Sequence, residues 1–151
     1  MFLRKLGWTS RDPKNSGSRT SREVMTAFII DTNIFVRLLT HDVVSQFEKA
    51  KKIFDAIEKS QQKGLVSILV INETIWILKK YYHLERKTFI PQILHLLALK
   101  NLKIIEVKKD VIVQALELML KHNVDFTDAY LFCAKGDKEI FSFDKDFKKL
   151  S

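Results

Sequence analysis

Short apolar runs alternate with helix-like segments along the chain from residue 27 to its end. Four runs have strand length and bulky apolar residues. They span Ala27–Ile30, Leu65–Ile68, Leu102–Val107 and Glu139–Phe143. Between them, apolar residues recur every three or four positions, a period typical of amphipathic helices. Strands separated by helices predict an α/β fold, in which a mostly parallel sheet carries helices on both faces.

The predicted helices begin at Ile34, follow an apolar stripe from Phe47 to Ile57, and include one that carries Glu73 and ends near Tyr82. Further helices are expected over Arg86–Lys100, Lys109–His122 and Asp125–Lys135. Gly64 is expected to end the second helix, because glycine is common just after helix ends. A terminal turn is expected over Asp146–Leu150.

Residues 1–24 lack this periodicity and are basic, with six lysines and arginines against two acids. They carry half of the net charge of +8. This extension has three interpretations: a start codon upstream of the real one at Met25, a disordered basic arm that binds nucleic acid, or a targeting peptide. We expect residues 25–151 to form the folded domain.

Composition narrows the class of protein. A length of 151 residues with 46% hydrophobic content fits one domain with its own core. The positive charge favours polyanionic partners. A single cysteine, Cys133, excludes an internal disulfide and fits a reducing compartment, so we expect a cytoplasmic protein. The four histidines show no paired ligand spacing, which argues against zinc, and no apolar stretch is long enough to cross a membrane.

Four acids stand among apolar neighbours, where an unpaired carboxylate is costly to bury. They are Asp31, at the end of the first strand, Glu73 and Asp128 on helices, and Asp144, after the last strand. Convergence on a cation would compensate their burial, and carboxylate oxygens suit Mg²⁺ or Mn²⁺.

Each acid also has a simpler structural interpretation. Asp31 can cap the helix that follows it, and Glu73 can be an exposed helix residue. Asp125 is a good N-cap with Asp128 in its first turn, so we assign Asp128 to the metal and Asp125 to capping. Asp146 is expected to be a cap rather than a ligand.

The order and spacing of four short motifs resemble those of PIN-domain ribonucleases, and most closely VapC-type toxins. The motifs are Ile30-Asp31-Thr32-Asn33, the acid at Glu73, Asp125-Phe126-Thr127-Asp128-Ala129 and Ser142-Phe143-Asp144-Lys145-Asp146-Phe147. The resemblance implies a three-layer α/β/α sandwich. It also implies that Asp31, Glu73, Asp128 and Asp144 bind Mg²⁺ or Mn²⁺, with Asn33 and Ser142 as polar support.

The activity implied by this resemblance is metal-dependent endoribonuclease chemistry, in which a metal-activated water hydrolyses RNA. A toxin of this kind would cut tRNA or rRNA, form a homodimer and be held in check by an antitoxin protein. Two alternatives stay open: a PIN nuclease for RNA processing or quality control, and a noncatalytic RNA-binding or scaffold module. A DNA-directed nuclease of related fold is also compatible with the sequence.

Overall fold

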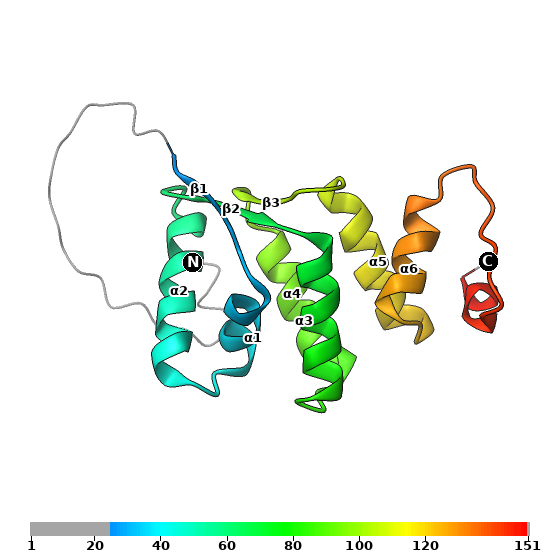
Figure 1. Cartoon of the computed structure of the whole chain (residues 1–151), viewed down its shortest axis with the longest axis horizontal. Helices are drawn as coiled ribbons and strands as arrows, with labels where there is room; N and C mark the ends of the chain where they lie inside the picture. The colour runs from blue at the N-terminus through cyan, green and yellow to red at the C-terminus, as the bar shows by residue number, and fades with distance from the viewer. Residues whose placement is uncertain (1–24, 151) are drawn as a thin grey trace, which may run out of the picture.

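The computed structural model describes residues 25–150 as an α/β domain with a small parallel sheet (Figure 1). The extension expected over residues 1–24 lies outside the described residues. The strands are β1 (Ala27–Ile29), β2 (Lys63–Val66) and β3 (Leu102–Ile104), in the order β1-β2-β3. Both pairings are parallel, with Phe28 opposite Gly64 and Gly64 opposite Leu102. The predicted parallel α/β architecture is confirmed.

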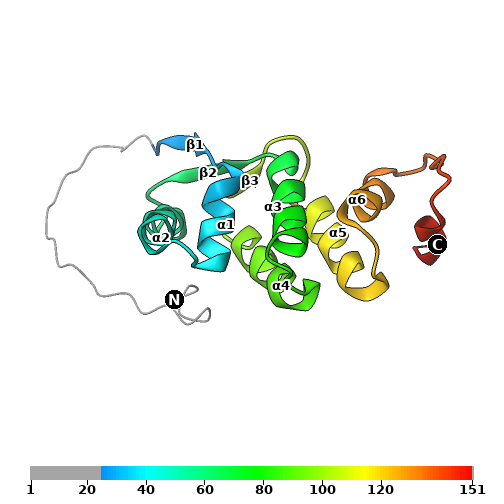
Figure 2. The same cartoon turned by 60° about the horizontal axis from the view of Figure 1, so that its bottom comes forward.

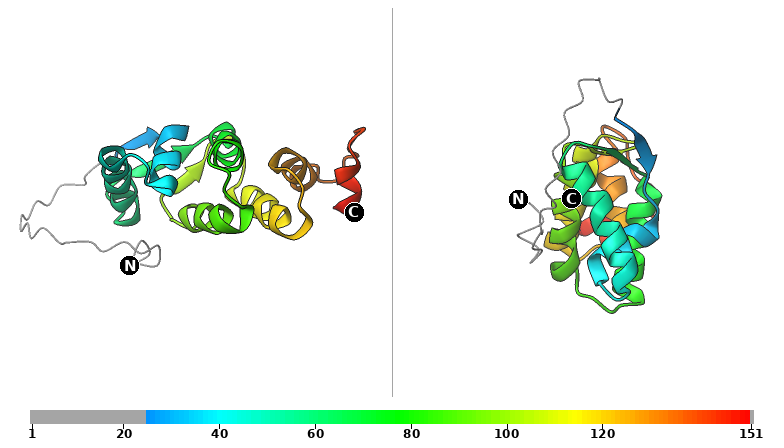
Figure 3. Two further views of the ribbon diagram at one scale, coloured as in Figure 1. Left: turned by 90° about the horizontal axis from the view of Figure 1, so that it is seen from below. Right: turned by 90° about the vertical axis from the view of Figure 1, so that its left-hand side faces the viewer.

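Helices make up most of the described chain. They are α1 (Thr32–Thr40), α2 (Val44–Glu58), α3 (Ile68–Lys80), α4 (Arg86–Leu97), α5 (Lys109–His122) and α6 (Phe126–Ala134), followed by a 3₁₀ helix, η2 (Lys145–Lys149). Figures 2 and 3 show α1 and α3 side by side near the sheet, with α5 and α6 forming a second group beyond them. None of the helices between residues 25 and 150 has the length and apolarity that a membrane crossing requires.

One continuous core holds these elements together. The side chains of Phe35 in α1 and Phe54 in α2 are both fully buried, and their rings meet edge to face with centroids 5.3 Å apart. The core also contains buried residues of α3, α4, β3 and α5, for example Ile71, Ile93, Leu102 and Leu116, respectively. The apolar stripes found in the sequence therefore face inward as amphipathic helices require.

The predicted last strand, Glu139–Phe143, is wrong, because this segment pairs with no strand among the described residues. The chain between α6 and η2 instead loops away from the sheet (Figures 1 and 2). Phe141 and Phe143 are 95% and 107% exposed. Alternating bulky residues indicate that a segment can form a strand, but pairing also needs a sheet edge within reach, and tertiary placement decides that.

Several boundaries also differ from the sequence prediction. Helix α2 ends at Glu58, and Gly64 lies inside β2 rather than at the helix end. Ser67 caps α3, so the chain is already helical at Ile68, where a strand residue was expected. The third strand stops at Ile104 instead of Val107.

Gly64 sits where three side chains leave no room for a larger residue. A Cβ atom at this position would lie 2.8 Å from Cδ1 of Ile30, Ile57 and Leu102. We expect Gly64→Ala to destabilise the domain by about 1–3 kcal/mol through overpacking, measured by urea unfolding. Gly136→Ala is the comparison, because Gly136 has φ +56° and open space around it, so its cost comes from backbone conformation alone. An unchanged unfolding midpoint in Gly64→Ala would show that the three side-chain ends yield.

Candidate metal centre

The first pair of candidate acids lies where β1 passes into α1. Asp31 is the N-cap of α1 and its carboxylate accepts a long hydrogen bond of 3.4 Å from the backbone N–H of Asn33. Thr32, only 5% exposed, donates its hydroxyl to Glu73 Oε2 at 2.5 Å. This bond holds the α3 carboxylate next to the residue that follows Asp31. The Glu73 carboxylate thus lies beside the start of α1, where Asp31 is the N-cap.

The second group of acids lies between α6 and η2. One carboxylate oxygen each from Asp128, Asp144 and Asp146 lies within 4.8 Å of the other two. Asp144 is the N-cap of η2, and its Oδ1 accepts from the backbone N–H of Asp146 at 2.9 Å. Ser142 Oγ accepts from the backbone N–H of Asp144, also at 2.9 Å. These bonds fix the turn that presents the Asp144 and Asp146 carboxylates to Asp128.

The electrostatics of this triad (Asp128, Asp144 and Asp146) favour a bound cation. Burial raises the pKa of the Asp128 carboxyl, and the negative charges of Asp144, Asp125 and Asp146 raise it further. Lys149 Nζ lies 2.5 Å from Asp146 Oδ1 and offsets part of this negative charge. A divalent cation would relieve the remaining repulsion, and three carboxylates in this arrangement are the oxygen donor set that Mg²⁺ and Mn²⁺ prefer.

The structure places the predicted site residues as a pair and a triad rather than as one group. Asp31 and Glu73 do not join the cluster that brings the other acids within ligand distance of one another. Neither is among the charges that shift the pKa of Asp128. The premise that all of these acids are buried is also wrong, since Asp31, Glu73 and Asp144 are exposed and Asp128 is half-buried. Exposure at a strand or helix end is decided by packing that apolar neighbours in sequence do not reveal.

Neither Asp146 nor Asp125 makes the helix-capping hydrogen bond that the sequence suggested. Asp146 was expected to be a cap, but Asp144 caps η2 and Asp146 lies in the acidic triad. Asp125 holds the N-cap position of α6, yet its side chain makes no capping hydrogen bond. Local sequence favours an acid at a helix start, but it does not show which of two neighbouring acids turns toward the backbone.

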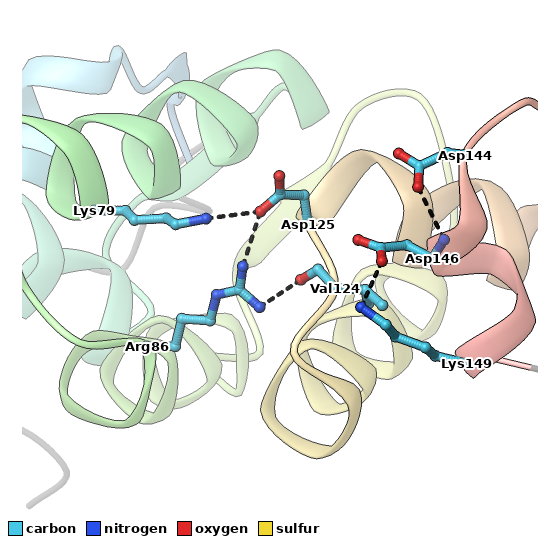
Figure 4. A network of polar contacts seen from close by, with 7 residues as sticks. All are labelled: Lys79, Arg86, Val124, Asp125, Asp144, Asp146 and Lys149. Atoms are coloured by element: carbon cyan, nitrogen blue, oxygen red, sulfur yellow. Dashed lines mark hydrogen bonds and ion pairs between the residues drawn. The ribbon is translucent and has the colours of Figure 1, made fainter.

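The Asp125 carboxylate instead joins three helices (Figure 4). Its Oδ1 lies 2.8 Å from Lys79 Nζ, at the end of α3, and 2.8 Å from Arg86 Nη2, at the start of α4. Arg86 also donates to the carbonyl of Val124 at 2.7 Å. The hydrogen bond from Lys79 lowers the pKa of Asp125, and the charge of Arg86 adds to this effect. Asp125 therefore positions α6, and with it Asp128, against the helix that carries Glu73.

Sequence reasoning missed the groups that orient the acids. Glu106 accepts from the Ser67 hydroxyl at 2.5 Å and from the backbone N–H of Ile68 at 2.9 Å, so it fixes the start of α3. Burial alone would raise the pKa of Glu106, but these hydrogen bonds outweigh it and lower the pKa. Thr32 belongs to the motif Ile30-Asp31-Thr32-Asn33, but the sequence suggested no role for its side chain. No local sequence signal identifies contacts across 39 or 41 positions of the chain.

Two buried threonines near the site make a matched pair for mutation. Thr32 Oγ1 donates to Glu73, whereas Thr74 Oγ1 is buried without a hydrogen-bond partner among the described residues. Replacing an unsatisfied hydroxyl by a methyl group removes a desolvation cost, so we expect Thr74→Val to stabilise the domain by about 1 kcal/mol. Thr32→Val should destabilise it by about 1 kcal/mol. Urea unfolding measures both, and equal losses in the two variants would mean that Thr74 has a partner in solution.

Comparison with known families identifies the domain. The PIN domain family model matches residues 28–151, which is most of the chain. The chain therefore belongs to the PIN domain family. PIN domains are nucleases as a class, act on nucleic acid and typically depend on a divalent metal. No curated protein and no solved structure matches the chain significantly.

Proposed function

We propose that this PIN domain is a metal-dependent endoribonuclease that acts in the cytoplasm as the toxin of a toxin–antitoxin pair. The observation that carries the proposal is the convergence of Asp128, Asp144 and Asp146 in a domain of this family. The order of acidic motifs, which resembles that of VapC-type toxins, supports the finer assignment. An antitoxin protein and a homodimer are part of this proposal and rest on the resemblance alone.

Each acid has a defined task in the proposed site. Asp128, Asp144 and Asp146 would hold the cation between α6 and η2, and Asp31 and Glu73 would add donors beside the start of α1. A Mg²⁺ or Mn²⁺ ion held by these residues would supply an activated water and neutralise charge on the phosphate. Thr32 keeps Glu73 oriented, and the contact of Lys149 with Asp146 keeps the site from accumulating excess negative charge before the cation arrives. Asn33 and Ser142 support the first strand end and the η2 turn, respectively.

Cleavage of RNA by the purified full chain tests the enzyme. A mixed pool of tRNA and rRNA is incubated with Mg²⁺ or Mn²⁺, and in parallel with EDTA. We expect discrete cleavage products only with the metals. No cleavage with either metal would contradict the enzyme assignment and favour a noncatalytic RNA-binding or scaffold module.

The toxin role requires a separate test in cells. Induced expression of the chain is expected to arrest growth, and the Asp128→Asn variant is expected to have no such effect. Normal growth on expression of an enzyme that cleaves RNA in vitro would instead favour a nuclease for RNA processing or quality control.

A further inference from the structure

A pocket of mixed chemistry is lined by residues of α1 and α3, the helices that begin after Asp31 and carry Glu73. It measures about 350 Å³ and is lined by α1, the loop after it, α3 and the start of the α3–α4 connection. Its lining includes Asn33, Arg37, Asp42, Trp76, Tyr81 and Tyr82. Asn33 follows Asp31 by two positions, and Trp76 follows Glu73 by three, about one helical turn. A ligand in this pocket would therefore lie beside the first pair of candidate acids.

Aromatic rings form an exposed wall of the pocket. Trp76 is 60% exposed and Tyr81 is 72% exposed, although both are large and largely apolar. The Tyr81 ring packs edge to face on Tyr82, with centroids 5.0 Å apart and an interplanar angle of 72°. Exposed aromatic faces of this kind stack on unpaired nucleobases, and they do so with little dependence on base identity.

A polar network holds this wall in place. Tyr82 donates its hydroxyl to Asp42 Oδ2 at 2.6 Å, and Arg37 Nη1 donates to the same oxygen at 2.6 Å and to the Tyr82 hydroxyl at 2.9 Å. Burial alone would raise the pKa of Asp42, but hydrogen bonds from Tyr82, Thr40 and Arg37 outweigh it and lower the pKa to about 2. Asp42 is therefore ionised throughout the physiological range, and the network stays formed.

Arg37 keeps one donor group for a ligand. Its Nε donates to Gln46 at 2.8 Å and its Nη1 is used by Asp42 and Tyr82, while Nη2 has no hydrogen-bond partner among residues 25–150. The guanidinium is thus fixed on one side and can still donate to a phosphate oxygen, which its planar geometry suits. A pocket that combines stacking faces, a fixed arginine and the Asn33 amide offers contacts for both the base and the phosphate of a nucleotide.

We propose that the pocket lined by Asn33, Arg37, Trp76 and Tyr81 binds an unpaired nucleotide of single-stranded RNA next to the scissile phosphate. This inference rests on the proposed nuclease function, because it takes the RNA to be held at Asp31 and Glu73. Trp76 and Tyr81 contact the base, Arg37 contacts the phosphate, and Asn33 contacts the base edge. The nuclease would then prefer single strands or loops in which a base is free to leave its stack.

Fluorescence of Trp76 provides a direct test without cleavage. The chain has two tryptophans, so a Trp8→Phe background leaves Trp76 as the only source of tryptophan emission. The probe is a labelled single-stranded RNA of about ten nucleotides, added in EDTA so that no metal-dependent cutting occurs. We expect saturable quenching of Trp76 emission by the RNA, with the same midpoint as the rise in RNA anisotropy.

Variants at the pocket supply the decisive comparison. Trp76→Ala should weaken RNA binding by about 5-fold to 150-fold, and Trp76→Phe, which keeps an aromatic face, should retain most of the affinity. Leu69→Ala is the matched control on the same helix, 73% exposed and outside the pocket lining, and should bind as the parent chain does. The proposal would be overturned if Trp76→Ala bound RNA with unchanged affinity and RNA did not quench Trp76 emission in the parent chain. That result would favour a protein partner as the ligand of this surface.

The two proposals fail in different ways. Metal-dependent cleavage with normal RNA binding by Trp76→Ala would keep the nuclease and overturn the pocket. Trp76-dependent RNA binding by a chain that cleaves no RNA with Mg²⁺ or Mn²⁺ would keep the RNA contact and overturn the nuclease.

Discussion

Asp128→Asn is expected to lower RNA cleavage about 100-fold or more. Asp128 and Asp146 are the two half-buried members of the acidic triad, and the carboxylate oxygen of Asp128 lies within 4.8 Å of those of Asp144 and Asp146. An amide of nearly equal size keeps the packing of α6 but removes a charge that the cation needs. The measurement is the initial rate of cleavage of the target RNA at saturating Mn²⁺.

The same variant should not lose stability when metal is absent. The pKa of Asp128 is raised in the folded state, first by burial and then by neighbouring acids. The folded state therefore holds its proton to higher pH than the unfolded state does, and this carboxyl lowers stability as pH rises above its ordinary pKa. At neutral pH, Asp128→Asn removes that unfavourable charge. We expect its unfolding midpoint in EDTA to equal or exceed that of the parent chain.

Metal-linked stability separates ligand loss from misfolding. Mn²⁺ should raise the melting temperature of the parent chain, because a ligand that binds only the folded state stabilises it. Asp128→Asn should lose most of this increase, whereas Asp137→Asn, an exposed acid before the η2 segment, should keep it. Equal Mn²⁺-induced shifts in the parent and Asp128→Asn would show that the triad does not hold the cation.

Truncation of Phe54 should have the largest effect on the fold. Phe54 is fully buried in α2 and packs edge to face on Phe35, so Phe54→Ala is expected to cost about 3–5 kcal/mol. This loss approaches the total stability of many domains. Phe54→Leu removes less volume and keeps a measurable transition if Phe54→Ala is unfolded. Urea unfolding of the full chain gives both values.

The same chemical change at Phe143 is the matched control. Phe143 is fully exposed, and Phe143→Ala should alter stability by no more than about 0.5 kcal/mol. Phe141→Ala, at 95% exposure, should behave in the same way. A loss of about 2 kcal/mol or more at either position would mean that Glu139–Phe143 packs against the sheet in solution, as its sequence pattern predicted.

Residue patterns alone were enough to predict most of the helices and the parallel sheet. The Lys109–His122 helix has the boundaries expected from its apolar spacing, and α6 lies inside its predicted range, because an amphipathic stripe depends on neighbours within two turns. The prediction that Gly64 ends a helix was wrong because glycine occurs both just after helix ends and in strands where neighbouring side chains leave no room for a Cβ atom. The crowding at Gly64 is caused by Ile30, Ile57 and Leu102, which lie in three separate parts of the chain, so the local sequence does not reveal it.

The candidate acids show the same division between local and long-range information. The sequence by itself predicted that Asp31 lies between the first strand and the first helix, that Asp128 lies in the first turn of its helix and that Asp144 precedes a terminal turn, because these positions depend on neighbouring residues. Only the tertiary structure decided that Asp146 joins Asp128 and Asp144, that Asp125 binds Lys79 and Arg86, and that Glu73 is held by Thr32. Each of these partnerships depends on how helices pack in space, and the distance between two charges in the fold is not a function of their separation in sequence.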